Sequence, residues 1–213
     1  MITLMTKTKS MLAMALAAVV APLVASAPVL ADFQTGYEAF EDRDYAGALA
    51  EFLPLAEQGD SRAQTLLGVM FRTGLLGMHD YDNAARWFRM AAERDEPDAH
   101  YNLGLMYFQH EAIPPDTLPT PEALGAAAVA HFGRAAELGH PEAQLYMGHI
   151  YAEGLFVTRD RLEAFKWYQL AAWERNSLAA AAMDRLAARM TPAQLAEAKD
   201  MARAWEKATR NLR

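Results

Sequence analysis

The chain has 213 residues, of which 53% are hydrophobic and 22% are charged, so it is long enough to bury a substantial core. It contains no cysteine, which excludes a disulfide, a thiol nucleophile and a thiolate metal site. Its net charge of −7 argues against nucleic acid and anionic membranes as partners, because both select a basic footprint. Alanine and other good helix formers are abundant, so we expect an all-α fold.

Residues 1–31 are typical of a secretory signal peptide. Lys7 and Lys9 precede an uncharged apolar run from 11 to 25, and small residues that suit a signal peptidase follow. The run is short for a membrane span of about 20 residues, although a retained anchor is the alternative. We expect cleavage after Ala31, which removes two lysines and no acid and so shifts the net charge from −7 to −9. The product would be periplasmic or secreted, with no membrane insertion.

A helical phrase then recurs along the chain. It reads Ala-x-x-x-Leu/Met-Gly and begins at Ala63, Ala99 and Ala143. A second phrase follows each copy, in which an aromatic residue lies three positions before an Ala-Ala pair. Periods of this size predict a solenoid of helix pairs. We expect about four units, at 33–60, 61–97, 98–141 and 142–177.

The interval between the aromatic residues of the second phrase changes once. It is 36 residues from Phe52 to Phe88 and from Phe132 to Tyr168, but 44 from Phe88 to Phe132. The extra length falls at 110–121, a segment with four prolines that no helix interior would tolerate. We predict a loop inserted between the two helices of one unit. Such loops often carry binding sites, and a tolerated surface insertion is the alternative.

Residues 143–154 and 164–172 carry both phrases almost without deviation, and they resemble the Sel-one-like repeat family, relatives of the tetratricopeptide repeat. The resemblance covers about residues 33–178. The unit at 98–141 departs from the pattern, since its loop is rich in proline and His131 stands where tryptophan is usual. Membership of this family would imply an all-α, right-handed solenoid of helix-turn-helix repeats.

The repeat phrase is no longer recognisable after residue 178. Thr191, Pro192 and Gln194 predict a helix start, with Thr191 as N-cap and Gln194 closing a capping box. We expect residues 178–213 to form a capping helix pair, whose last helix at about 192–210 has an apolar side made of Leu195, Met201, Ala202, Trp205 and Ala208.

No catalytic motif is present. The six histidines form no HExxH pattern, and the chain has no nucleophile elbow, phosphate-binding loop or dinucleotide fingerprint. His100 and His131 occupy positions that glutamine and tryptophan hold in other units, so we interpret them as substitutions within the scaffold. We therefore expect no catalytic residue, no metal and no cofactor. The alternatives are an enzyme acting on the cell wall or on β-lactams, as discussed for cysteine-rich relatives, and a structural subunit of an envelope assembly.

The resemblance implies a non-catalytic scaffold that binds a protein or peptide partner. In this family the first helices line the concave side, so the free positions lie six and three residues before each first-helix glycine and one, four and five residues after it. Ordinary packing or solvation of the same positions is the alternative interpretation. The candidate partner-binding residues are Arg62, Thr65, Arg72, Tyr101, Leu105, Phe108, Gln109, Leu145, His149 and Glu153.

Overall fold

The computed structural model describes residues 31–111 and 120–209. The predicted signal peptide, apart from its last residue, and most of the predicted proline-rich loop therefore lie outside the described residues. Every helix or strand within the two described ranges is an α-helix. These helices are α1 (Phe33–Glu41), α2 (Tyr45–Glu57), α3 (Ser61–Thr73), α4 (Tyr81–Ala92), α5 (Pro97–Phe108), α6 (Pro121–Glu137), α7 (Pro141–Glu153), α8 (Arg161–Trp173), α9 (Ser177–Ala187) and α10 (Pro192–Thr209).

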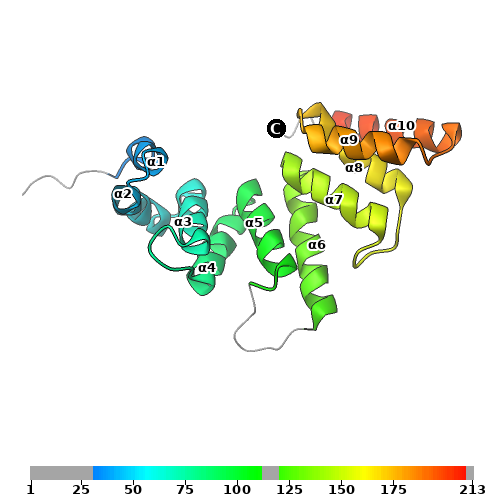
Figure 1. Ribbon diagram of the computed structural model, residues 1–213. Helices are drawn as coiled ribbons and strands as arrows, with labels where there is room; N and C mark the ends of the chain where they lie inside the picture. Colours follow the sequence, from blue (N-terminus) through cyan, green and yellow to red (C-terminus); the bar gives the residue numbers. More distant parts are fainter. Residues whose placement is uncertain (1–30, 112–119, 210–213) are drawn as a thin grey trace, which may run out of the picture. The chain divides into compact units, whose positions relative to one another are not determined.

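Helices that follow one another in the chain pack together. α1 pairs with α2, α3 with α4, α5 with α6 and α7 with α8, and each pair contacts the next through α2–α3, α4–α5, α6–α7 and α8–α9 (Figure 1). The buried side chains of the described helices form a series of clusters along the chain rather than one central core. This arrangement confirms the predicted all-α solenoid of helix pairs.

The ends of the helices follow local sequence rules. The side chains of Asp32, Asp60 and Asp160 each accept hydrogen bonds from backbone N–H groups in the first turn of the helix that follows. The first helices α3 and α7 end at Gly74 and Gly154, which have φ angles of 73° and 74°. Only glycine adopts this left-handed conformation at no steric cost, so these two glycines end α3 and α7 at the same place in their repeats.

Within each pair, a glycine of the first helix approaches an aromatic ring of the second. A β-carbon built on any of these glycines would lie within 3.0 Å of a ring atom, which real contacts essentially never show. The rings themselves are buried, with no more than 3% of their surface exposed. Glycine inside a helix costs about 1 kcal/mol relative to alanine, and the close approach explains why that cost recurs. The contacts are Gly36–Phe52, Gly68–Phe88, Gly104–Phe132 and Gly148–Tyr168.

Buried glutamines join successive units. The side-chain amide of Gln64 donates to the carbonyl of Ala56 at 2.8 Å, and that of Gln144 donates to the carbonyl of Ala136 at 3.2 Å. Each bond gives a second donor to a carbonyl in the last turn of the preceding second helix, which also accepts the backbone N–H of the glycine three residues later.

His100 holds the position of these glutamines in the third unit. Its Nδ1 atom lies 3.1 Å from Nδ1 of His131, and the His131 ring stacks on Tyr107. The two histidines therefore contact each other between α5 and α6, in positions that belong to the repeat scaffold. Burial, together with the charges of His100 and Arg89, lowers the pKa of His131 to about 4.

The last helix begins as its sequence predicts. The backbone N–H of Thr191 donates to Oε1 of Gln194 at 3.0 Å, and the N–H of Gln194 donates to Oγ1 of Thr191 at 3.2 Å. These two bonds form the expected capping box. Ala208, expected on the apolar side, is exposed, whereas Ala198 and Ala202 are fully buried.

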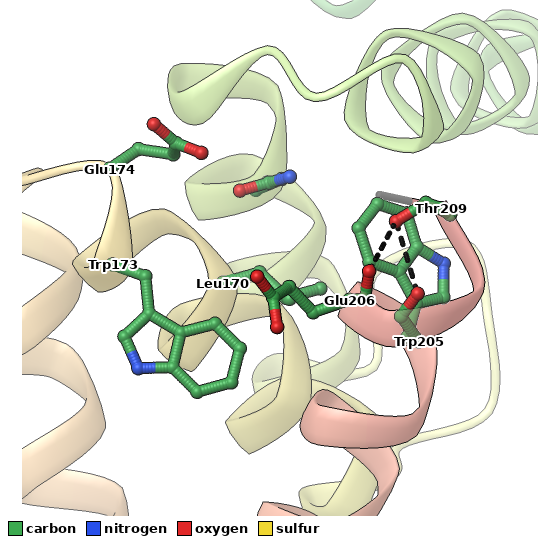
Figure 2. Close-up of a pocket in the computed structure, with 7 residues that line it drawn as sticks. Leu170, Trp173, Glu174, Trp205, Glu206 and Thr209 are labelled. Carbon is green, nitrogen blue, oxygen red and sulfur yellow. Dashed lines mark hydrogen bonds between the residues drawn. The ribbon is translucent and has the colours of Figure 1, made fainter. Parts of the chain in front are cut away.

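Both C-terminal helices pack on α8, and the main contact of α10 is with α8 rather than with α9. Trp205 of α10 meets Trp167 of α8 edge-on, with ring centroids 5.6 Å apart. Figure 2 shows Trp205 and Thr209 of α10 across a hollow from Leu170 and Trp173 of α8. The C-terminal helices thus cover the apolar surface that the last full repeat leaves open.

We expect Gly148→Ala to lower the free energy of unfolding by about 1–3 kcal/mol, because the added methyl group would overlap the Tyr168 ring. Gly133→Ala is the matched control, since Gly133 is also helical and its β-carbon would meet only the Met147 methyl group, at 3.9 Å. That control should gain about 1 kcal/mol from the better helix propensity of alanine. Urea unfolding followed by circular dichroism measures both changes. Equal stabilisation by the two substitutions would contradict the close packing at Gly148.

We expect part of the stability to depend on the protonation of His131. Its pKa is about 4 in the folded protein and near the ordinary value of 6.5 when unfolded, so the unfolded chain binds the extra proton. This contribution is fully present above pH 6.5 and is lost as the pH falls towards 4. Relative to His131→Gln, the free energy of unfolding of the native protein should fall by at most about 1.4 kcal/mol per pH unit in that window. Parallel losses in the two proteins, measured by urea unfolding at each pH, would contradict the assignment.

Candidate partner-binding face

The first-helix face consists of the positions six and three residues before each first-helix glycine and one, four and five residues after it. Its outer positions are exposed, as at Arg62, Gln109 and Glu153. The positions three residues before glycine are packed, because Thr65 is 6% exposed and Leu145 is 7% exposed. The outer positions of the face therefore expose their side chains to solvent, whereas the positions three residues before glycine are buried.

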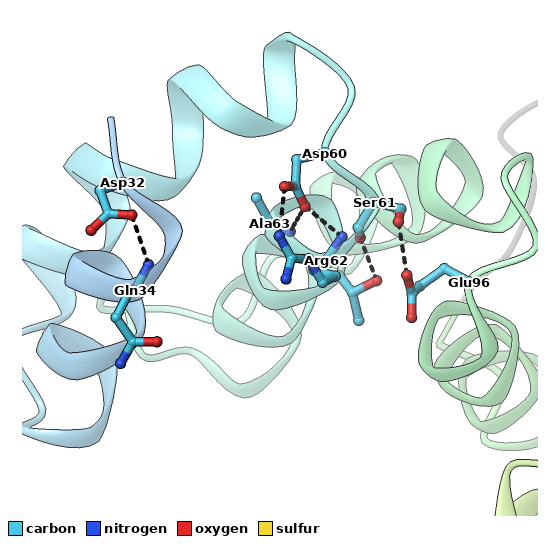
Figure 3. Close-up of polar contacts among 8 residues, drawn as sticks. Asp32, Gln34, Asp60, Ser61, Arg62, Ala63 and Glu96 are labelled. Carbon is cyan, nitrogen blue, oxygen red and sulfur yellow. Dashed lines mark hydrogen bonds and ion pairs between the residues drawn. The ribbon is translucent and has the colours of Figure 1, made fainter. Parts of the chain in front are cut away.

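At the start of the face, α1 and α3 are linked by an aromatic ring and a cation. The guanidinium carbon of Arg62 lies 4.2 Å from the centre of the Phe33 ring, and both residues line a hollow of about 260 Å³ with Tyr37. Ser61 donates to a carboxylate oxygen of Glu96 at 2.8 Å, which ties the start of α3 to the start of α5 (Figure 3). Arg62 also pairs with Asp60, its neighbour in the N-cap, at 3.2 Å.

Arg72 of α3 bridges this face to the end of α5. Its Nε atom donates to the Glu111 carboxylate at 2.8 Å, and a terminal nitrogen donates to the Gln109 amide oxygen at 2.7 Å. The side chains of Arg72 and Glu111 are 17% and 20% exposed, so this ion pair is largely shielded from water. Arg72 thus holds the end of α5 against α3.

Between α5 and α7 lies a cluster of aromatic rings. Tyr101 stacks on His140 at 4.4 Å and meets Tyr146 at 6.0 Å, while Phe108 packs edge-on against Phe132 and Tyr146. Burial raises the pKa of Tyr101 to about 12, so its hydroxyl stays neutral. Phe108 remains 38% exposed and is the apolar side chain that this cluster offers to solvent.

Between α7 and α9, the face opens into a polar hollow of about 400 Å³. The hydroxyl of Tyr168 lies 2.9 Å from Nδ1 of His149. Burial raises the pKa of Tyr168 to about 12, and burial together with a nearby arginine lowers that of His149, so both groups are neutral at pH 7. The charged residues around the hollow are Glu153, Arg159, Arg185 and Arg189.

The structure corrects part of the residue set that the spacing suggests. The spacing predicts that Thr65 and Leu145 are free, but both are buried because the position three residues before glycine faces neighbouring helices. Leu105 is partly buried against the core, and Arg72 already has a carboxylate partner. The members that keep substantial exposed surface are Arg62, Phe108, Gln109, His149 and Glu153.

The same spacing rule places further residues on this face. Applied to Gly36, it gives Phe33 and Tyr37 of α1. In α9, Asp184 stands in the place of the glycine, and the residues one and five positions later are Arg185 and Arg189. These were missed because α9 lacks the repeat phrase. Arg159, which lies in the loop before α8, follows from no spacing rule.

In residues 31–111 and 120–209, no group of three or more histidine, aspartate or glutamate side chains is placed to hold a metal ion. None of the helices in those ranges combines the length and apolar character needed to cross a membrane. The first-helix face combines aromatic surface, hydrogen-bond donors and guanidinium groups.

Two solved structures have a similar fold. One is c5321, described as a protective antigen present in uropathogenic Escherichia coli strains that displays an SLR fold, with 27% identity, a TM-score of 0.69 and 81% of this chain covered. The other is a Sel1 repeat protein from Oxalobacter formigenes, with 28% identity, a TM-score of 0.63 and 71% of this chain covered. The matches span only 37% and 59% of those chains, respectively. No curated protein sequence matches this chain.

The family model described as Sel1 repeat matches more than half of the chain, at residues 61–96, 97–118, 122–140 and 141–172. The first match coincides with the pair α3–α4 and the last with α7–α8. The two middle matches fall on α5 and α6 and are separated within the proline-rich segment that lengthens this unit. The chain therefore belongs to the Sel1 repeat family.

Proposed function

We propose that this protein is an exported, non-catalytic scaffold that binds a protein or peptide partner along its first-helix face. Sel1 repeat proteins are generally scaffolds for protein interaction. The observation that carries the proposal is the row of exposed side chains on that face, which the packing of the repeats leaves unused. Packing accounts for the glycines, the alanines and the buried rings, so recognition is assigned to the residues that remain.

The chemistry of the face supports this assignment. Tyr37 and Phe108 are large, rigid side chains that are 40% and 38% exposed, one near each end of the segment from α1 to α5. Tyrosine and arginine are enriched among the residues that dominate binding energy at interfaces. Arg62 lies beside this aromatic surface, so a partner can bury apolar area and form polar bonds on the same helices.

Export is supported by the start of the folded region. Asp32 is the N-cap of α1, and its backbone nitrogen lies 2.9 Å from a carboxylate oxygen of Glu51. Cleavage after Ala31 would turn that nitrogen into an α-ammonium group beside a carboxylate. The cleavage site that the signal sequence favours thus coincides with the first residue that the fold uses.

We expect a photo-crosslinking phenylalanine analogue at Tyr37 or Phe108 to capture a specific envelope protein in living cells. The matched controls are the same analogue at Tyr81, an exposed aromatic residue of α4, and at Ala130, an exposed residue of α6. Both controls lie on second helices, so they should give no adduct of the same mass. Adducts of equal yield from all four positions would contradict a binding surface on the first helices.

We expect the mature protein to begin at Asp32. Intact mass and N-terminal sequencing of protein from the periplasmic fraction test this directly, because cleavage after Ala31 gives one defined product. Recovery of the uncleaved chain in the membrane fraction would contradict the export proposal and favour a retained anchor.

A further inference from the structure

The hollow between α7 and α9 carries an unusual set of charges. We call it the arginine hollow and define it by His149, Arg159, Tyr168, Arg185 and Arg189, with Glu153 at its edge. Its volume is about 400 Å³, and its apolar lining residues are Ala152, Ala182 and Leu186. A space of this size accommodates a few side chains of a bound peptide.

The positive charge of the hollow is not explained by contacts within the chain. Three arginines face one glutamate, in a protein whose net charge is −7. In the described ranges, no carboxylate forms an ion pair with Arg185 or Arg189. Arg185 lies in the last turn of α9 and Arg189 follows the end of that helix, and because both line the same hollow their like charges repel each other. An anionic ligand would relieve that repulsion.

Two donors of the hollow, Arg159 and Tyr168, are held in place before any ligand binds. Nε of Arg159 donates to the carbonyl of Ala152 at 2.7 Å, which fixes the guanidinium group and leaves its terminal nitrogens free to donate elsewhere. The Tyr168 hydroxyl can donate to Nδ1 of neutral His149, and that tautomer carries its proton on Nε2. Donors that are already oriented lose less conformational entropy on binding.

We propose that the arginine hollow binds carboxylate groups of an acidic peptide segment of the partner, an inference that rests on the proposed scaffold function. Guanidinium groups bind planar carboxylates through two parallel hydrogen bonds, which suits Arg185 and Arg189. A long polyanion is disfavoured because the rest of the chain is acidic. The carboxylate comes either from an Asp or Glu side chain or from the C-terminus of the peptide.

Titration of the exported protein, purified from the periplasm and labelled with ¹⁵N, tests this proposal by NMR. The probes are acetylated hexapeptides of three kinds: one with internal Asp and Glu and an amidated end, one with internal Asn and Gln and a free C-terminal carboxylate, and one with neither carboxylate. At least one of the first two should shift the Arg Nε–H resonances in a saturable manner. The third should not, and which of the first two binds identifies the source of the carboxylate.

The double variant Arg185→Gln/Arg189→Gln should weaken binding at least tenfold, because it removes two charge-assisted contacts. Lys199→Gln/Lys207→Gln is the matched control, since it changes the net charge equally on exposed positions of α10 and should stay within twofold of the native protein. Circular dichroism checks that both variants fold. Equal weakening by both variants, absence of binding by all three peptides, or tighter binding of inorganic phosphate would each overturn the carboxylate site.

The two proposals fail in different ways. If the crosslinks from Tyr37 and Phe108 to the same envelope protein persist undiminished in Arg185→Gln/Arg189→Gln, the scaffold function stands and the hollow is not its carboxylate site. If no crosslink forms in the native protein while the peptides still bind, the scaffold function fails and the hollow remains a carboxylate site.

Discussion

The contact on which the structure depends is the one between a glycine of each first helix and an aromatic ring of its partner. It occurs at Gly36, Gly68, Gly104 and Gly148, where no β-carbon fits beside the ring. One helix pair of this length cannot bury enough apolar area to offset the entropy of ordering it. Close packing within pairs and burial between pairs must act together, which is why the buried clusters follow one another along the chain.

This packing also determines which residues are available for function. The glycine fixes the side of each first helix that meets the second helix, so residues at fixed distances from it face away. Neighbouring first helices then cover part of that face, as the burial of Thr65 and Leu145 shows. The side chains that remain exposed differ from unit to unit: Arg62 lies beside an aromatic ring near the start, Phe108 emerges from an aromatic cluster, and Arg185 lines a basic hollow near the end. A uniform scaffold thus carries a varied surface.

Most of the fold could be predicted because the residues of the repeat phrase are the ones that pack together within each helix pair. The phrases locate α3 to α8, and the capping box at Thr191 locates the start of α10. The candidate site was predicted less well, because it depends on contacts between units. The partner of Arg72 is Glu111, which follows α5 and has no fixed spacing from α3. Arg185 was missed because α9 has Asp184 where the other first helices have glycine.

The central claim is that the residues of the repeat phrase are used for packing. The exposed side chains of the first helices are then left to bind the partner. Hydrogen exchange of the protein, free and in complex with the partner captured by crosslinking, tests it most directly. Binding should slow exchange in α1, α3, α5, α7 and α9 and leave the exposed turns of α2, α4 and α6 unchanged. Protection confined to second helices, or spread equally over both sets, would contradict the account.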